Sequence, residues 1–259
     1  MNDLEGRPVV AGNWKMNMNV EETREFFRNL SPPARLSGED KGPTLLVFPP
    51  ALSLAAAAEA RPDEPEVGLG VQNIHWEDSG AFTGELSASM ARLAGATHVL
   101  VGHSERRHLF GETNEEVRKK VEAALAVRLV PVVCLGETLD EREAGKVDEV
   151  ILEQLYAFLP VLESSPELPA LVAYEPVWAI GTGKTATPED ASTVHEVLRK
   201  RLVRRLGADR GGALPLLYGG SVKPDNAREL LDAPDVDGVL VGGASLDPGS
   251  FMEIAAAAL

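Results

Sequence analysis

Three polar groups that could carry out acid–base chemistry follow short apolar runs of the chain. Glu175 follows LVAY, His103 follows VLVG, and Lys15 lies just after VVAGN. A carboxylate at the end of a buried strand is costly unless it has a partner or a chemical role, so Glu175 is a candidate general base. A base, an imidazole and a cation together suit the removal of a proton next to a carbonyl group.

His103 precedes a segment, SERR, that has the composition of a helix start. The free N–H groups of a helix N-terminus disfavour a cation, so the ring is predicted to be neutral and able to donate a hydrogen bond to a carbonyl oxygen. The alternative is a structural histidine. The other histidines have no comparable setting, and His195, in a helical pattern, is expected to be partly exposed.

Asn13 and Lys15 leave the first apolar run with alternate-residue spacing, so both side chains can point the same way. In a chain whose net charge is −15, such a lysine could anchor an anionic substrate. The alternative is a surface lysine whose amine is solvated.

Paired glycines follow the last two predicted strands, in YGGS at 218–221 and VGGAS at 241–245. Glycines let backbone N–H groups approach a ligand, and loops at these positions form the common phosphate site of barrel enzymes. The alternative is an ordinary turn. Together with the three polar groups, these loops indicate a small phosphorylated aldose or ketose as substrate.

The segment 176–185, PVWAIGTGKT, has a proline at its start, an apolar middle and glycines near its end. This composition suits a lid that moves about two hinges, and the alternative is a static packed loop. Its G-x-G is too short for a dinucleotide-binding fingerprint.

The elements that must position these groups alternate between short apolar runs and longer helical patterns. Eight such units in 259 residues average about 32 residues, close to the ~30 of a βαβ module. This pattern predicts an α/β protein with a single (β/α)8 barrel domain over residues 1–259, and the alternative is an open doubly wound sheet. The predicted strands are 9–13, 44–48, 67–72, 98–102, 130–135, 171–174, 214–218 and 238–241.

Several helix starts can be predicted from capping residues. Asn19 with Glu22 and Thr113 with Glu116 have the spacing of a capping box, and Thr187 opens the sequence TPED.

Composition excludes several functional classes. A charge of −15 is the wrong sign for a general nucleic-acid or anionic-membrane surface. The basic cluster at 199–205 falls at the end of a helical pattern, where cations complement the helix dipole. A single cysteine, Cys134, and the lack of a signal-like or membrane-spanning run favour a cytoplasmic protein. No metal-ligand spacing or cofactor motif is present, so neither a metal nor a cofactor is expected.

Eight motifs in order give the chain a close resemblance to the triosephosphate isomerase family, over residues 12–246. They are GNWKMN, VQN, GAFTGELS, VGHSERR, CLGE, AYEPVWAIGTGKTAT, YGGSV and VGGASL. The resemblance implies a TIM barrel that interconverts D-glyceraldehyde 3-phosphate and dihydroxyacetone phosphate through an enediolate.

The resemblance also implies a role for each site residue. Glu175 is the base that moves a proton between adjacent carbons, and neutral His103 polarises and protonates the oxygens. Lys15 and Asn13 stabilise the enediolate and hold substrate, and Glu105 orients Lys15. The phosphate-binding residues are Gly181, Ser221, Gly242 and Gly243, and residues 176–185 form the closing lid.

The family implies a homodimer or an assembly of dimers such as a tetramer. The loop at 75–85 inserts beside the neighbour's site, and Thr83 is the residue expected to reach across. Two alternatives keep the same residues. One is an isomerase of a four-carbon sugar phosphate, and the other is a barrel that binds a sugar phosphate or a partner protein without turnover.

Overall fold

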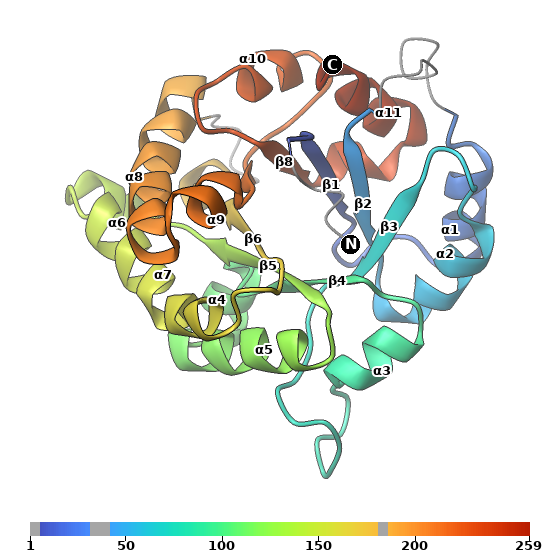
Figure 1. Ribbon diagram of the computed structural model, residues 1–259. Coiled ribbons are helices and arrows are strands. Elements are labelled where there is room, and N and C mark those ends of the chain that lie inside the picture. Colours follow the sequence, from blue (N-terminus) through green and yellow to red (C-terminus); the bar gives the residue numbers. More distant parts are fainter. Residues whose placement is uncertain (1–5, 32–41, 181–185) are drawn as a thin grey trace.

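Eight parallel strands form a closed barrel in the order β1 to β8 (Figure 1). The structure is a computed structural model that describes residues 6–31, 42–180 and 186–259. The strands are β1 (Val9–Asn13), β2 (Thr44–Phe48), β3 (Val67–Val71), β4 (His98–Val101), β5 (Val130–Leu135), β6 (Leu171–Tyr174), β7 (Leu216–Tyr218) and β8 (Gly238–Val241).

The pairing of β1 with β8 closes the ring, with Val9 opposite Gly238. An open doubly wound sheet is therefore excluded, and the (β/α)8 barrel is confirmed. Strand β4 ends one residue before its predicted end, because Gly102 turns the chain with a φ of 71°. Strand β7 begins two residues late, because the Leu214 N–H still bonds to the carbonyl of Arg210.

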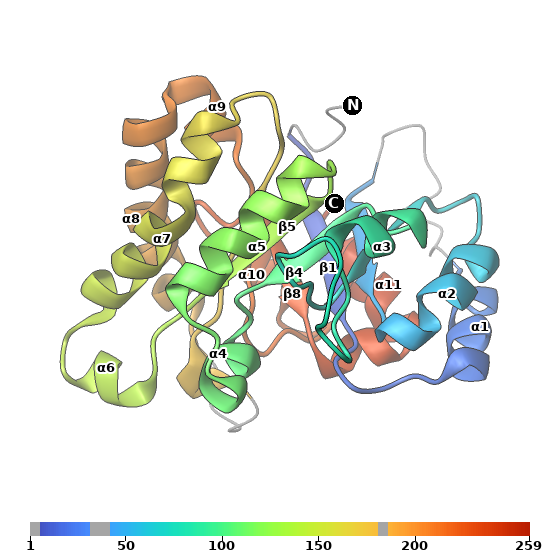
Figure 2. The same cartoon turned by 90° about the horizontal axis from the view of Figure 1, so that it is seen from below.

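The helices surround the barrel, as the two views show (Figure 1, Figure 2). The predicted capping boxes at Asn19 and Thr113 are present, and Thr187 caps its helix with Pro188 in the first turn. The helices are α1 (Val20–Arg28), α2 (Leu54–Ala60), α3 (Ala88–Leu93), α4 (Ser104–Phe110), α5 (Asn114–Ala126), α6 (Leu139–Glu143), α7 (Val147–Ser164), α8 (Pro188–Leu206), α9 (Ala208–Ala213), α10 (Ala227–Leu231) and α11 (Pro248–Ala257).

Alternate strand residues divide the core into two parts, as the two-residue period of a strand requires. One set packs outward against the helices, and Val10 and Val172 belong to it. The other set, with Ala11, Leu100 and Ala173, fills the barrel interior. This interior contains Cys134, and burial raises the pKa of its thiol, so the chain's only cysteine is a packed side chain.

His195 is fully buried, so the expectation of partial exposure was wrong. It lies on the apolar stripe of α8 with Val194 and Leu198, and its Nδ1 atom is 2.8 Å from the carbonyl oxygen of Asp235. Its ring also meets the Tyr174 ring edge-on at 5.9 Å.

Two buried histidines should make the stability of the fold depend on pH. Burial lowers the pKa of His98 and of His195 to about 4, whereas an unfolded histidine titrates at about 6.5. The unfolded chain therefore binds more protons below about pH 6.5. The free energy of unfolding should fall as the pH drops toward 4, by about 3 kcal/mol for each histidine.

Urea denaturation of the native chain and of His195→Gln, from about pH 7 to about pH 4.5, measures this effect. The stability advantage of the native chain over the variant should shrink as the pH falls. A difference that stays constant with pH would contradict the assignment to His195.

No helix among the described residues is long and apolar enough to cross a membrane.

Candidate active site

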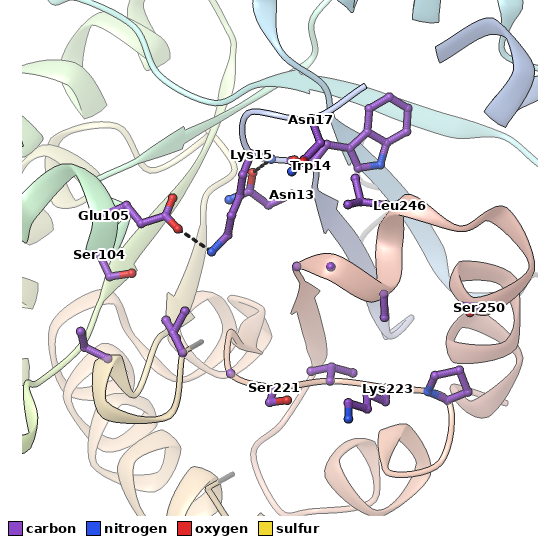
Figure 3. Close-up of a pocket in the computed structure, with 18 of the residues that line it drawn as sticks. Asn13, Trp14, Lys15, Asn17, Ser104, Glu105, Ser221, Lys223, Leu246 and Ser250 are labelled. Carbon is purple, nitrogen blue, oxygen red and sulfur yellow. Dashed lines mark hydrogen bonds and ion pairs between the residues drawn. The ribbon is translucent and has the colours of Figure 1, made fainter. Parts of the chain in front are cut away.

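A pocket of about 960 Å³ opens at the carboxyl ends of the strands. Segments that follow β1, β4, β7 and β8 line it, so groups distant in sequence face one another (Figure 3). The predicted residues Asn13, Lys15, Glu105 and Ser221 are among its lining, as are Gly242 and Gly243.

Lys15 is held in an unusual backbone conformation at the end of β1, with a φ of 52°. Its N–H donates to Oδ1 of buried Asn13 at 3.0 Å. The Nε2 group of Gln72 donates to the Lys15 carbonyl at 2.8 Å and to that of Phe48 at 2.9 Å. The left-handed region is costly for a residue with a side chain, so these bonds fix a conformation that the chain alone would not favour.

The Lys15 side chain extends into the pocket and meets Glu105 (Figure 3). Its Nζ atom lies 2.7 Å from Oε1 of Glu105, and both side chains remain partly open to solvent. The pair holds the lysine amine in one place while leaving donors free for a ligand.

His103 lies two residues after the end of β4 and caps the N-terminus of α4. Its Nδ1 atom accepts a hydrogen bond from the N–H of Glu105 at 3.2 Å, and its Nε2 atom is 2.9 Å from Oε1 of Glu175. This pattern assigns the proton of a neutral ring to Nε2, the atom that faces Glu175.

Two opposing effects act on the His103 ring. Burial lowers the pKa of His103, the Glu175 carboxylate raises it, and the net direction is upward. The prediction of a neutral ring rested on the helix N-terminus alone, and the contact with Glu175 opposes that effect. If Glu175 turns away toward a substrate, burial and the helix N-terminus remain and favour the neutral ring.

Glu175 lies at the end of β6 and is 2% exposed. Burial raises the pKa of Glu175, but His103, the Ser104 N–H and Lys15 together lower it by more than burial raises it. The group is therefore held as a carboxylate. Its Oε2 atom accepts the Ser104 N–H at 2.9 Å, and its own N–H donates to the Leu135 carbonyl at 2.8 Å.

Gly136 makes the close approach of β5 and β6 possible, and the sequence argument did not single it out. A Cβ atom there would lie 1.8 Å from the Glu175 carbonyl oxygen. Any side chain at this position would displace the residue that carries the candidate base.

The predicted lid lies only partly within the described residues. Gly181 and the rest of 181–185 fall outside them. Trp178 lies in the short 3-10 helix Val177–Ala179 and donates from Nε1 to Oε1 of Glu137 at 2.8 Å. The guanidinium of Arg142 lies over the Trp178 ring, 4.6 Å from its centre.

Sequence reasoning missed Glu137, although a signal was available. This fully buried carboxylate follows β5 in CLGE, just as Glu175 follows β6. Its Oε1 atom accepts hydrogen bonds from the Tyr174 hydroxyl at 3.1 Å and from Arg142 at 3.2 Å. The rule that identified Glu175 applies equally to this position.

Thr83 is exposed and does not line the pocket of its own chain. The loop that carries it extends beyond the ring of helices, between β3 and α3 (Figure 1). Within the loop the His75 ring lies 4.1 Å from the Trp76 ring and 4.2 Å from the Phe82 ring. The loop is therefore held together by packed rings, and Thr83 is exposed on it.

Among the described residues, no group of three or more histidine, cysteine or acidic side chains is arranged to hold a metal ion.

The fold and the site define a class: a barrel enzyme with a buried carboxylate–histidine pair beside an ion-paired lysine. A sequence profile described as triosephosphate isomerase matches residues 8–258. The triosephosphate isomerase of Alkalilimnicola ehrlichii is 49% identical, over 97% of this chain and 98% of the relative. That of Solibacter usitatus is 46% identical, over 96% and 98%.

A crystal structure of triosephosphate isomerase from Bartonella henselae superposes with a TM-score of 0.82. It is 40% identical and covers 96% of this chain and 97% of that one. The chain belongs to the triosephosphate isomerase family.

Proposed function

We propose that the chain catalyses the reaction for which its family is named, the interconversion of D-glyceraldehyde 3-phosphate and dihydroxyacetone phosphate in glycolysis and gluconeogenesis. The observation that carries this proposal is the 2.9 Å contact between His103 Nε2 and Glu175 Oε1 beside Lys15. Once Glu175 turns from His103 toward the pocket, which neither residue lines in this structure, these groups would give one small substrate a base, a proton donor and a cation. The family match favours the triose over a four-carbon sugar phosphate and over a binding barrel without turnover.

In the proposed mechanism Glu175 removes a proton from the carbon next to the carbonyl and returns it to the adjacent carbon. The neutral His103 ring donates from Nε2 to the substrate oxygens and exchanges protons with them. Lys15 and Asn13 stabilise the negative charge of the enediolate, and Glu105 holds the Lys15 amine in place. The buried setting strengthens these electrostatic interactions.

The substrate phosphate would be held largely by backbone N–H groups of Ser221, Gly242, Gly243 and Gly181. Residues 176–185 would act as the lid that keeps the enediolate from losing its phosphate to water. The open surfaces of Gly242 and Gly243 support this role, because a Cβ atom at Gly242 would have only Lys15 Cε near it, at 3.9 Å, and one at Gly243 would meet nothing within 4 Å.

We also propose a cytoplasmic enzyme that forms a homodimer, or a tetramer built from dimers, in which each chain is a single barrel domain. The loop at 75–85 would insert beside the partner's site, where Thr83 would contact the partner. The exposed apolar side chains of Met16, 96% exposed, and Leu52, 91% exposed, support the assembly.

Steady-state turnover of D-glyceraldehyde 3-phosphate in a chelator-containing buffer tests the proposal, with D-erythrulose 4-phosphate run in parallel. Rapid turnover of the triose alone is the expected result, and retention of activity in chelator would agree with a reaction that needs no metal. Preference for the tetrose would change the substrate, and no turnover of either would refute the enzymatic role.

Dilution should lower the specific activity if Thr83 completes the partner's site. Below the dimer dissociation constant each chain loses the contact, and activity should fall in step with the dimer fraction measured by light scattering. Thr83→Val should lower activity even at concentrations where the dimer is intact. A fully active monomer would contradict the claim.

A further inference from the structure

Arg107, on α4 one turn beyond His103, binds three neutral acceptors. Its Nε atom donates to the Gly102 carbonyl at 2.7 Å, and its Nη1 atom to Oδ1 of Asn114 at 2.7 Å. Its Nη2 atom donates to the Cys134 carbonyl at 3.2 Å. A guanidinium presents its donors in a rigid fork, so these bonds fix the relative positions of the groups they reach.

The charge of Arg107 has no carboxylate within ion-pairing distance among the described residues. Burial lowers the pKa of this guanidinium, although the group stays protonated. A half-buried cation that meets only neutral acceptors loses solvation without gaining an ion pair. Its placement therefore calls for an explanation other than charge pairing.

The carbonyl groups that Arg107 binds lie just after β4, which leads into His103, and near the end of β5, which pairs with β6, the strand that leads into Glu175. Gly102 directly precedes His103, and Cys134 directly precedes Leu135, whose carbonyl accepts the Glu175 N–H at 2.8 Å. A single guanidinium thus connects the backbone that leads into His103 to the neighbouring strand β5, which hydrogen-bonds to the backbone of Glu175.

The guanidinium can lie this close to Gly102 because glycine has no side chain. A Cβ atom at Gly102 would lie 2.8 Å from Nη2 of Arg107 and 3.1 Å from the Cys134 carbonyl oxygen. Its N–H is also held, by Oε1 of Glu112 at 3.0 Å. The residue before His103 is therefore fixed on both sides, and the left-handed φ of 71° requires glycine there.

We propose that Arg107 is a positioning residue that joins the ends of β4 and β5 and so sets the placement of His103 relative to Glu175. The inference rests on the proposed isomerase function. Arg107 itself does not line the pocket. Its contribution is expected in kcat, because a misplacement of about 1 Å between reacting groups can cost about a hundredfold in rate.

The test uses Arg107→Lys, Arg107→Met and Asn114→Ala in the full chain, assayed with the triose phosphate. A lysine amine keeps the charge but cannot reach both strand ends in a fork, so Arg107→Lys and Arg107→Met should both lose kcat by about tenfold to a hundredfold. Asn114→Ala removes the acceptor of Arg107 Nη1 at a partly exposed position and leaves the other two bonds of the guanidinium in place. This variant should lose kcat a few-fold. KM and competitive inhibition by inorganic phosphate should stay within about twofold in all three variants.

Arg210 offers a matched control. Its guanidinium also binds three carbonyls, that of Leu162 in the last turn of α7 and those of Ser165 and Leu168 just after this helix. This segment leads into the start of β6, at the opposite end of the barrel from the pocket. Arg210→Met should lower the melting temperature by an amount comparable to Arg107→Met and leave kcat unchanged.

A loss of kcat in the Arg107 and Asn114 variants, with KM and the Arg210 control unaffected, supports the inference. Full kcat in Arg107→Lys overturns it, since that variant keeps only the charge. An equal loss of kcat in Arg210→Met also overturns it, because the effect would then reflect general loss of stability. If Arg107→Met does not fold, Arg107→Lys and Asn114→Ala decide the question. An inactive native chain would count against the proposed function instead.

Discussion

Replacing Glu175 with glutamine is expected to lower kcat at least about a thousandfold, because a positioned general base contributes about 10²–10⁴ in rate. Glutamine has nearly the same size and keeps an oxygen that can accept the Ser104 N–H, which now bonds to Oε2 at 2.9 Å. It cannot accept a proton from carbon. The variant should therefore fold and bind substrate with KM changed only a few-fold, while the proton-transfer step becomes very slow.

Glu163→Gln is a suitable control, since Glu163 pairs with Arg205 on the outer helices, away from the pocket. It should retain full kcat. Stopped assays at saturating triose phosphate, with circular dichroism to verify folding, measure both variants. Near-full activity in Glu175→Gln would remove Glu175 as the base.

The strands were predictable because each is a short apolar run between turn and cap signals, and the parallel ring buries both faces of the sheet. The predicted strands differ from the observed ones only at their ends, where the conformation of a single residue determines where a strand begins or stops. The apolar run predicted that Leu214 belongs to a strand, but its N–H donates to the Arg210 carbonyl at the end of α9.

The burial of His195 could also have been predicted. Ala191, Val194, Leu198 and Leu202 form an apolar stripe at helical spacing, and His195 falls on the same stripe. The prediction treated the imidazole as polar and therefore as exposed. The structure satisfies one ring nitrogen with the Asp235 carbonyl, a partner 40 residues away that no local pattern indicates.

Within the site, the sequence placed the polar groups at the strand ends but could not give their contacts. The bond from the Gln72 side chain to the Lys15 carbonyl and the bond from the Ser104 N–H to the Glu175 carboxylate join residues far apart in the chain. Such bonds depend on the angle between neighbouring strands and on side-chain rotamers. The ion cluster around buried Glu112 was also not predicted, although Arg106 and Lys120 lie only six and eight residues from it in the chain.

Glu112 is a buried carboxylate that several donors hold in its charged form. Lys120 approaches its Oε2 atom at 2.9 Å and Arg106 at 2.6 Å, while the Gly102 N–H donates to Oε1. Burial raises the pKa of Glu112, but Lys120 and Arg106 together lower it by more than burial raises it, so the net shift of the pKa is downward. The group thus stabilises the fold above the pKa of an unfolded glutamate, and this contribution is lost as the pH falls through the folded value.

Lys120→Met is therefore expected to lower the free energy of unfolding by about 3–5 kcal/mol near pH 7, since it leaves a buried carboxylate without its main countercharge. The loss should shrink in acid, where Glu112 can be protonated. Lys119→Met, at the neighbouring and more exposed position on α5, should cost less than about 1 kcal/mol. Adding Glu112→Gln to Lys120→Met should restore part of the stability, because the buried carboxylate is removed and its other partner, Arg106, is partly exposed to solvent. Urea denaturation of the native chain, the two lysine variants and the double variant measures these free energies. An equal loss of unfolding free energy in Lys120→Met and Lys119→Met would show that the buried Lys120–Glu112 pair stabilises the fold no more than a surface pair.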